Sequence, residues 1–145
     1  MTAAPGTGGL RLAIGLGCDR GTPEATVQAC LLQALAQVPA DLRHVAAAAS
    51  IAAKADEAAF LALAARHGWP LQWYTAAQLA AVPVPNPSAT VLRYMGTPSV
   101  SEAAALLAAG AAHDASALLV EKHRLRGADG RNATVSIARM AHAAG

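Results

Sequence analysis

Short apolar runs alternate with segments of helical periodicity, and this alternation constrains the fold more than any other feature. Residues 10–17 are apolar and end in glycines, which is typical of a buried strand that opens into a loop. Apolar side chains then recur with helical spacing over residues 24–38, until Pro39 ends the pattern. A strand followed by a helix, repeated along one chain, predicts an α/β fold with a mostly parallel sheet.

The rest of the chain continues the pattern. We expect further strands over residues 44–49, 70–74, 117–120 and 133–138. The expected helix starts are Thr22 to Glu24, Ser50 for a helix ending near His67, Thr75, and Ser99 or Ser101 for a helix ending at Gly110. Residues 88–95 are expected to form a helical turn. Three prolines predict an extended connector over residues 83–87.

These elements predict a single-domain three-layer sandwich over residues 10–140. A polar, glycine-containing loop separates the last two strands, so we expect a mostly parallel central sheet with an antiparallel C-terminal strand pair. Residues 1–9 read as a flexible leader and residues 141–145 as a tail. A length of 145 residues suits one core, and much of the 54% hydrophobic content is alanine, which predicts a thin, closely packed core.

Composition excludes several classes of function. The longest apolar stretch, residues 45–53, is too short to span a membrane, and the first residues lack the features of a signal peptide. A net charge of +2 and few aromatic residues argue against nucleic acid as a partner. The two cysteines and five histidines form no ligand pattern, so we expect no metal and no cofactor, and a reduced, cytoplasmic location.

A glycine-rich segment follows the first expected strand and leads into the first helix. Such a turn exposes backbone N–H groups beside the positive end of a helix, where a phosphate or carboxylate is stabilised. Arg20 could add a forked contact to a carboxylate. The candidate binding residues here are Gly15, Gly17, Cys18, Arg20, Gly21 and Thr22. The alternative is that the glycines merely permit a tight turn, and neither a dinucleotide fingerprint nor a Walker lysine is present.

Cys18 lies in the same segment, where a helix N-terminus could lower the pKa of its thiol. No histidine is near it in sequence to act as a base, so we expect Cys18 to be dispensable for covalent chemistry.

Two lysines are predicted to share one rim of the sheet. Lys54 follows the second strand and lies three residues from Glu57, which places both on one helix face; the alternative is a solvated ion pair. Ser50 belongs to the same junction. Lys122 is expected at the end of a strand, with Thr134 returning beside it, although a plain strand-end charge is the commoner case. Glu102 lies at an expected helix start, where an acidic residue favours the helix dipole.

These segments, in this order, resemble the CobE/CbiG C-terminal family of cobalamin biosynthesis. The resemblance spans about residues 10–138. The matching residues are Gly15, Gly17, Cys18, Arg20 and Gly21; Ser50, Lys54, Ala55, Asp56 and Glu57; Pro87 and Ser88; Gly96, Val100, Glu102, Ala103, Ala104, Ala105 and Leu106; Gly110; Lys122; and Thr134 and Val135.

The resemblance implies a role in building the corrin ring. The expected function is CobE-like: binding or processing a precorrin tetrapyrrole of the aerobic pathway, with possible transient contacts to other pathway enzymes. The binding set is then the glycine-rich segment with Ser50, Lys54, Ser88, Lys122 and Thr134. An alternative is a cobalt-precorrin-5A hydrolase-type enzyme, with Lys54, Glu57 and Glu102 as catalytic groups. A nucleotide-binding module is a further alternative, suggested only by the glycines.

Overall fold

A five-stranded mixed sheet forms the centre of the computed structural model, which describes residues 10–141. The strand order is β3-β2-β1-β5-β4. Strands β1 (Leu12–Cys18), β2 (Val45–Ile51) and β3 (Leu71–Tyr74) are parallel, whereas β5 (Asn132–Arg139) is antiparallel to both β1 and β4 (Leu118–Arg126). The predicted antiparallel C-terminal pair is confirmed, and β4 therefore runs in the same direction as β1.

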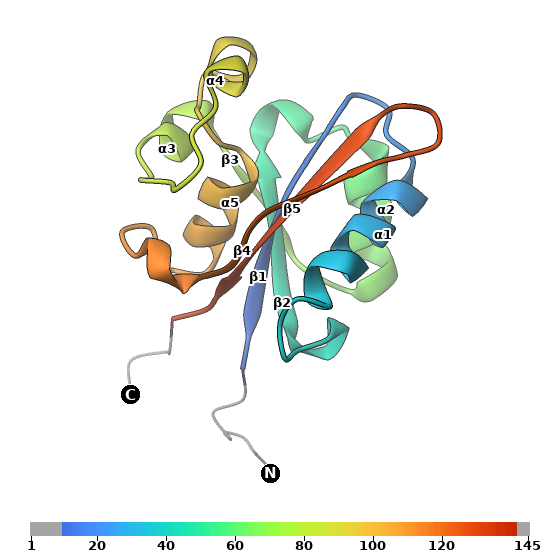
Figure 1. Ribbon diagram of the computed structural model, residues 1–145, viewed down its shortest axis with the longest axis horizontal. Helices are drawn as coiled ribbons and strands as arrows, with labels where there is room; N and C mark the ends of the chain where they lie inside the picture. The colour runs from blue at the N-terminus through green and yellow to red at the C-terminus, as the bar shows by residue number, and fades with distance from the viewer. Residues whose placement is uncertain (1–9, 142–145) are drawn as a thin grey trace.

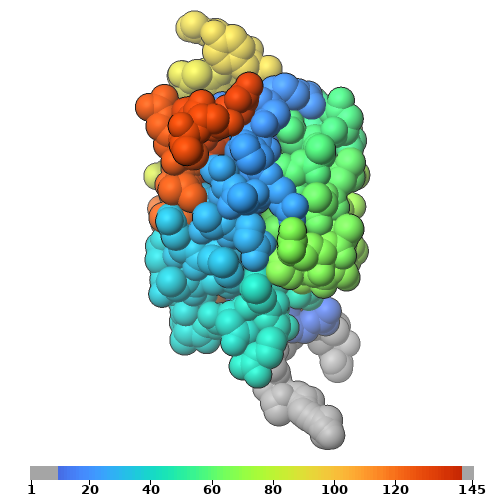
Figure 2. All heavy atoms as spheres, turned by 90° about the vertical axis from the view of Figure 1, so that its right-hand side faces the viewer, coloured from blue at the N-terminus to red at the C-terminus, as the bar shows by residue number. Residues whose placement is uncertain are grey.

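Helices cover both faces of the sheet (Figure 1), which confirms the predicted three-layer sandwich. Helices α1 (Glu24–Leu35) and α2 (Ala58–His67) lie side by side over one face, the one turned to the viewer in Figure 2. Helix α5 (Ser101–Ala108) covers the other face, with α3 (Ala76–Ala80) against it. The remaining elements are α4 (Ala89–Met95) and the short 3-10 helices η1 (Leu42–His44), η2 (Ala52–Lys54) and η3 (Ala115–Ala117).

The two faces of β1 carry side chains of different size. Leu12, Ile14 and Leu16 alternate toward the core under α1 and α2, whereas Ala13 and Gly15 face α5. A Cβ atom at Gly15 would lie 1.8 Å from the backbone oxygen of Ser101 in α5. The alanine-rich composition thus allows α5 to approach the sheet closely on this face.

Several expected helix starts have a different role. Ser50 lies inside β2, fully buried, and its hydroxyl donates to the Leu16 carbonyl at 2.7 Å, while α2 begins only at Ala58. The Thr22 hydroxyl donates to the Asp19 carbonyl, and the α5 N-cap is Val100, without a side-chain cap bond. Ser50 was misassigned because a serine after an apolar run can either cap a helix or satisfy a neighbouring strand.

The capping prediction at Thr75 is confirmed, and the helical turn expected over residues 88–95 is helix α4, whose N-cap is Ser88. The Thr75 hydroxyl accepts from the Gln78 N–H at 3.1 Å, and the Ser88 hydroxyl accepts from the Val91 N–H at 3.2 Å. Both bonds join residues three apart in sequence, so each depends only on the local pattern.

Strand β4 is longer than expected and continues to Arg126, so Lys122 lies within the strand and not at its end. The expected strand stopped at Val120 because polar residues follow it. As an edge strand, β4 leaves many of these side chains exposed, which hides the apolar signal. The pairing of β4 with β5 is irregular between Val120 and His123, and such irregularities re-aim side chains.

Residues 1–9 and 142–145, which include the predicted leader and most of the predicted tail, lie outside the described residues. No helix within residues 10–141 combines the length and apolar character needed to cross a membrane.

Candidate functional site

A cavity of about 470 Å³ opens at the edge of the sheet where β1 and β2 end. Ligand crevices in open α/β sheets form at this carboxyl edge of the parallel strands. Strands β4 and β5, helix α4 and the start of α5 complete its walls. The lining residues are Gly17, Cys18, Asp19, Arg20, Ile51, Lys54, Thr90, Val91, Tyr94, Met95, Val100, Ser101, Lys122, Arg124, Asn132 and Thr134.

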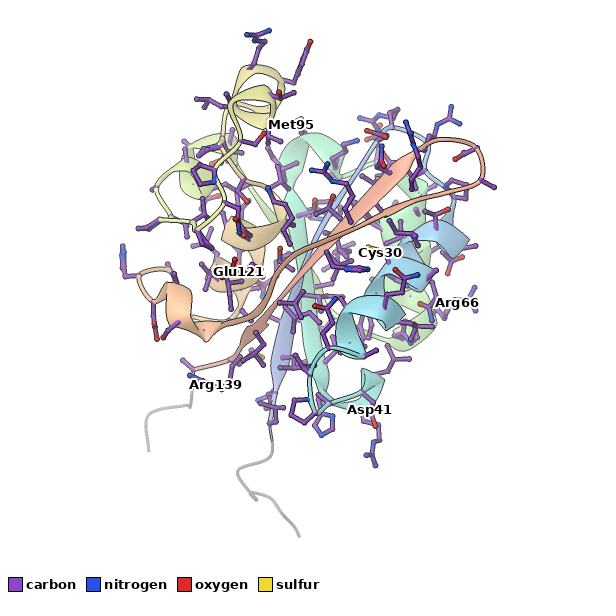
Figure 3. The ribbon with its side chains drawn as sticks, viewed as in Figure 1. Cys30, Asp41, Arg66, Met95, Glu121 and Arg139 are labelled. Atoms are coloured by element: carbon purple, nitrogen blue, oxygen red, sulfur yellow. The ribbon has the colours of Figure 1, made fainter. Side chains whose placement is uncertain are left out.

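The cavity combines cationic and apolar walls. Lys54 comes from η2, after β2, and Lys122 and Arg124 come from β4, two residues apart on one face of the strand. Val91, Tyr94 and Met95 come from α4, and Figure 3 shows Met95 at the end of α4 that is nearest the sheet. An amphipathic ligand with anionic groups would find partners on both walls.

The ammonium groups of both lysines donate hydrogen bonds to backbone carbonyls. The Lys54 ammonium donates to the Cys18 carbonyl at 2.7 Å and lies 3.5 Å from Glu57 Oε1, and its side chain is only 12% exposed. The Lys122 ammonium donates to the Asn86 carbonyl at 3.2 Å. Because one carbonyl does not use all three N–H groups of an ammonium, Lys122 retains donor capacity for a ligand.

Arg20 lines the cavity but already has acidic partners. Its guanidinium lies 2.8 Å from Asp56 Oδ1 and 3.4 Å from Glu57 Oε1. The hydrogen bond from Arg20 lowers the pKa of Asp56, so this partner stays ionised at neutral pH. A ligand carboxylate would therefore have to compete with Asp56 for Arg20.

Glu57 and Glu102 are buried outside the cavity lining. Glu57 is 3% exposed and its Oε2 accepts the Gly21 N–H at 3.0 Å, where Gly21 has a φ of +79°. It thus connects the loop after β1 to the segment after β2. Glu102 is fully buried and accepts from Asn86 Nδ2 at 2.7 Å and from the Ser99 hydroxyl at 3.2 Å. Both carboxylates make bonds that stabilise the fold.

The structure brings together part of the predicted binding set. The predicted residues that line this cavity together are Gly17, Cys18, Arg20, Lys54, Lys122 and Thr134. The predicted residues that lie outside the cavity lining are Gly15, Gly21, Thr22, Ser50, Ser88, Glu57 and Glu102. Gly15 and Gly17 lie in β1 itself, so the glycine-rich segment does not form the phosphate-binding turn that the nucleotide alternative required.

Sequence reasoning missed Arg124 and the wall from α4. Arg124 had a usable signal, because a residue two positions after Lys122 on a strand points the same way. The lining residues of α4 are four apart, as Thr90 and Tyr94 or Val91 and Met95, and so lie on one helix face. Because this stretch was predicted only as a helical turn, the sequence offered no indication of what that face contacts.

Cys18 has the environment of a protonated thiol. Burial raises its pKa, and the nearby Lys54 ammonium only partly opposes this effect. The second cysteine, Cys30, is buried in the core, and burial raises its pKa to about 11. Among residues 10–141, no three His, Cys, Asp or Glu side chains group in a way that could hold a metal ion.

The fold and the cavity define a three-layer α/β domain with an amphipathic cavity at the carboxyl edge of its sheet. A sequence model of the family described as "Cobalamin synthesis G C-terminus" matches residues 12–138. The chain belongs to this family, and so to the proteins of cobalamin biosynthesis.

Similarity to named proteins supports the same family assignment. The chain is 44% identical over 107 residues to "Protein CobE" of a Sinorhizobium species, a match that covers 70% of the chain and 68% of that protein. It is 38% identical over 100 residues to "Cobalt-precorrin-5A hydrolase" of Priestia megaterium, which covers 69% of the chain but only 27% of the hydrolase. The crystal structure of CobE, "a protein from the cobalamin (vitamin B12) biosynthetic pathway", superposes with a TM-score of 0.76 at 32% identity, covering 92% of this chain and 96% of that one.

Proposed function

We propose that this protein binds a precorrin in the cavity at the carboxyl edge of its sheet. The proposal rests on one observation: three cationic side chains, Lys54, Lys122 and Arg124, line the same cavity as an apolar wall from α4. A precorrin is a tetrapyrrole macrocycle with acetate and propionate carboxylates around its rim. Its carboxylates would meet the cations, and its ring would meet Val91, Tyr94 and Met95.

Binding without catalysis is the form of this function that the site residues favour. The two carboxylates considered as acid–base groups, Glu57 and Glu102, are buried outside the cavity lining and hydrogen-bonded to the fold. Cys18 has a raised pKa, which is unfavourable for a nucleophile. A binding protein of this kind would act in the cytoplasm and would exchange its ligand through transient contacts with other enzymes of the pathway.

The second candidate is deacylation of a cobalt-precorrin, favoured by the 38% identity to the hydrolase from Priestia megaterium. The family resemblance implies that such an enzyme opens a lactone of the cobalt-precorrin and releases a two-carbon aldehyde, whereas binding alone releases no product. Incubation with a lactone-bearing precorrin, followed by analysis of the solution for that product, distinguishes the two functions.

Titration with a stable corrin polycarboxylate, cobyrinic acid, tests the binding proposal. The absorbance spectrum should change saturably, and the affinity should fall as salt is added, because the attraction between charges is screened. The fully esterified corrin is the matched control, since it keeps the ring and removes the charges. We expect it to bind at least about 10-fold more weakly, the loss of one charge-assisted bond. Equal affinity for acid and ester would contradict the proposal.

Cys18→Ser should leave corrin binding within about 2-fold of the wild-type affinity, because serine is nearly isosteric with cysteine and, like the protonated thiol, carries no charge. The reason is that Cys18 lines the cavity as a neutral thiol and contributes to the lysine site through its backbone carbonyl, which serine keeps. The same titration measures the effect. Complete loss of binding by a folded Cys18→Ser variant, or a ligand trapped on the sulfur, would show that the thiol has a chemical role.

A further inference from the structure

Helix α4 belongs to an excursion of the chain, residues 88–98, that closes on itself. The Ser88 N–H donates to the Pro98 carbonyl at 2.8 Å, which joins the two ends of the excursion. Ser88 caps the start of α4, and Gly96 ends the helix with a φ of +77°. The excursion therefore has its own local supports, and Figures 1 and 2 show α4 projecting beyond the rest of the molecule.

Tyr94 is the most exposed large apolar side chain of the described residues, at 75%. Its hydroxyl has no hydrogen-bond partner among residues 10–141, whereas the other tyrosine, Tyr74, donates to Gln72. An aromatic ring gains much of its stabilising effect by covering apolar surface, so the exposure of Tyr94 is unexplained by the fold alone.

The position of Tyr94 relates it to the cavity. Thr90, Val91, Tyr94 and Met95 form the face of α4 that lines the cavity. Lys54, Lys122 and Arg124 line the same cavity from the sheet edge. Leu92 is also exposed, at 51%, but it is not among the lining residues. Exposure alone thus does not distinguish the two side chains, whereas their relation to the cavity does.

We propose that Tyr94 stacks on the face of the tetrapyrrole and makes the cavity selective for a conjugated macrocycle over other polycarboxylates. This inference rests on the proposed function and adds a recognition element to it. The cations recognise carboxylates, which many metabolites carry, whereas the ring face offers a large apolar surface that a small polycarboxylate without a ring lacks. Stacking with ring centroids several ångströms apart requires no hydrogen-bond partner for the hydroxyl.

Substitutions on α4 test this inference, because both exposed side chains can be changed without opening the core. Tyr94→Ala should weaken cobyrinic acid binding about 10-fold, since aromatic contacts and the burial that accompanies them are together of that order. Tyr94→Phe should bind as the wild type does, because it keeps the ring. Leu92→Ala is the matched control and should also bind as the wild type does.

Two further measurements separate stacking from charge. The effect of Tyr94→Ala should persist at high salt, where the attraction between the ligand carboxylates and the lysines is screened. Citrate, a polycarboxylate without a ring, should bind the wild type weakly. Its affinity should be the same for Tyr94→Ala, because citrate has no ring face for Tyr94 to contact.

The outcomes distinguish this inference from the function it extends. If the wild type binds the corrin and Tyr94→Ala binds it with the same affinity, the role of Tyr94 is overturned and the binding proposal still stands. Equal losses in Tyr94→Ala and Leu92→Ala would also overturn it, because the effect would then belong to the helix as a whole. Absence of corrin binding by the wild type would overturn both.

Discussion

Gly15→Ala is expected to lower the free energy of unfolding by about 3 kcal/mol, the upper part of the usual range for an overpacked core. The added Cβ would lie 1.8 Å from the backbone oxygen of Ser101 and 2.8 Å from the backbone nitrogen of Ala105. Both atoms belong to α5, so no side chain can rotate away and the helix itself must move from β1. Denaturant unfolding measures the loss as a lower midpoint with an unchanged slope.

Gly17→Ala is the matched control, two residues further along the same strand. The nearest atom to its added Cβ would be the Thr134 Cβ at 3.8 Å, an ordinary contact distance. Its stability should stay within about 1 kcal/mol of the wild type, and alanine has the higher strand tendency of the two residues. A Gly15→Ala variant as stable as the wild type would mean that α5 does not approach β1 as closely as described.

Gly15 also illustrates what the sequence could not predict. Its place in a glycine-rich segment suggested an anion-binding turn, because glycine is compatible with both unusual backbone angles and close packing. Which of the two applies depends on Ser101 and Ala105, which are far away in sequence. The burial of Glu57 and Glu102 outside the cavity lining could not be predicted for the same reason, because it depends on the distant partners Gly21 and Asn86.

Local patterns, by contrast, predicted the fold class. The strand–helix alternation, the glycine that ends α2 and the cap at Thr75 all depend on neighbours within a few residues. The shared cavity of Lys54 and Lys122 could be anticipated from topology alone, because both lysines follow or lie on strands that run the same way. The wall from α4 had no such local signal.

A double variant, Lys54→Met with Lys122→Met, is expected to have the largest effect on ligand binding. Each lysine bound to a carboxylate contributes about 1.5–3 kcal/mol, so the loss of both should weaken corrin binding by at least about 100-fold. Methionine keeps most of the side-chain volume and removes the charge. The two lysines come from η2 and β4 and have different partners, Cys18 and Asn86, so their effects should be nearly additive.

The control for this variant is Arg66→Ala with Arg139→Ala, which removes two positive charges from sites outside the cavity lining. Figure 3 shows Arg139 at the end of the molecule opposite to Met95, with Arg66 on the α2 side. If the cavity holds the ligand, this control should keep nearly the wild-type affinity at moderate salt, because distant exposed charges are screened. The lysine variant should also lose much of the salt dependence of binding, since two of the three cations proposed to meet the ligand carboxylates are gone. Equal losses in both double variants would mean that net charge governs binding and that the ligand has no defined site at Lys54 and Lys122.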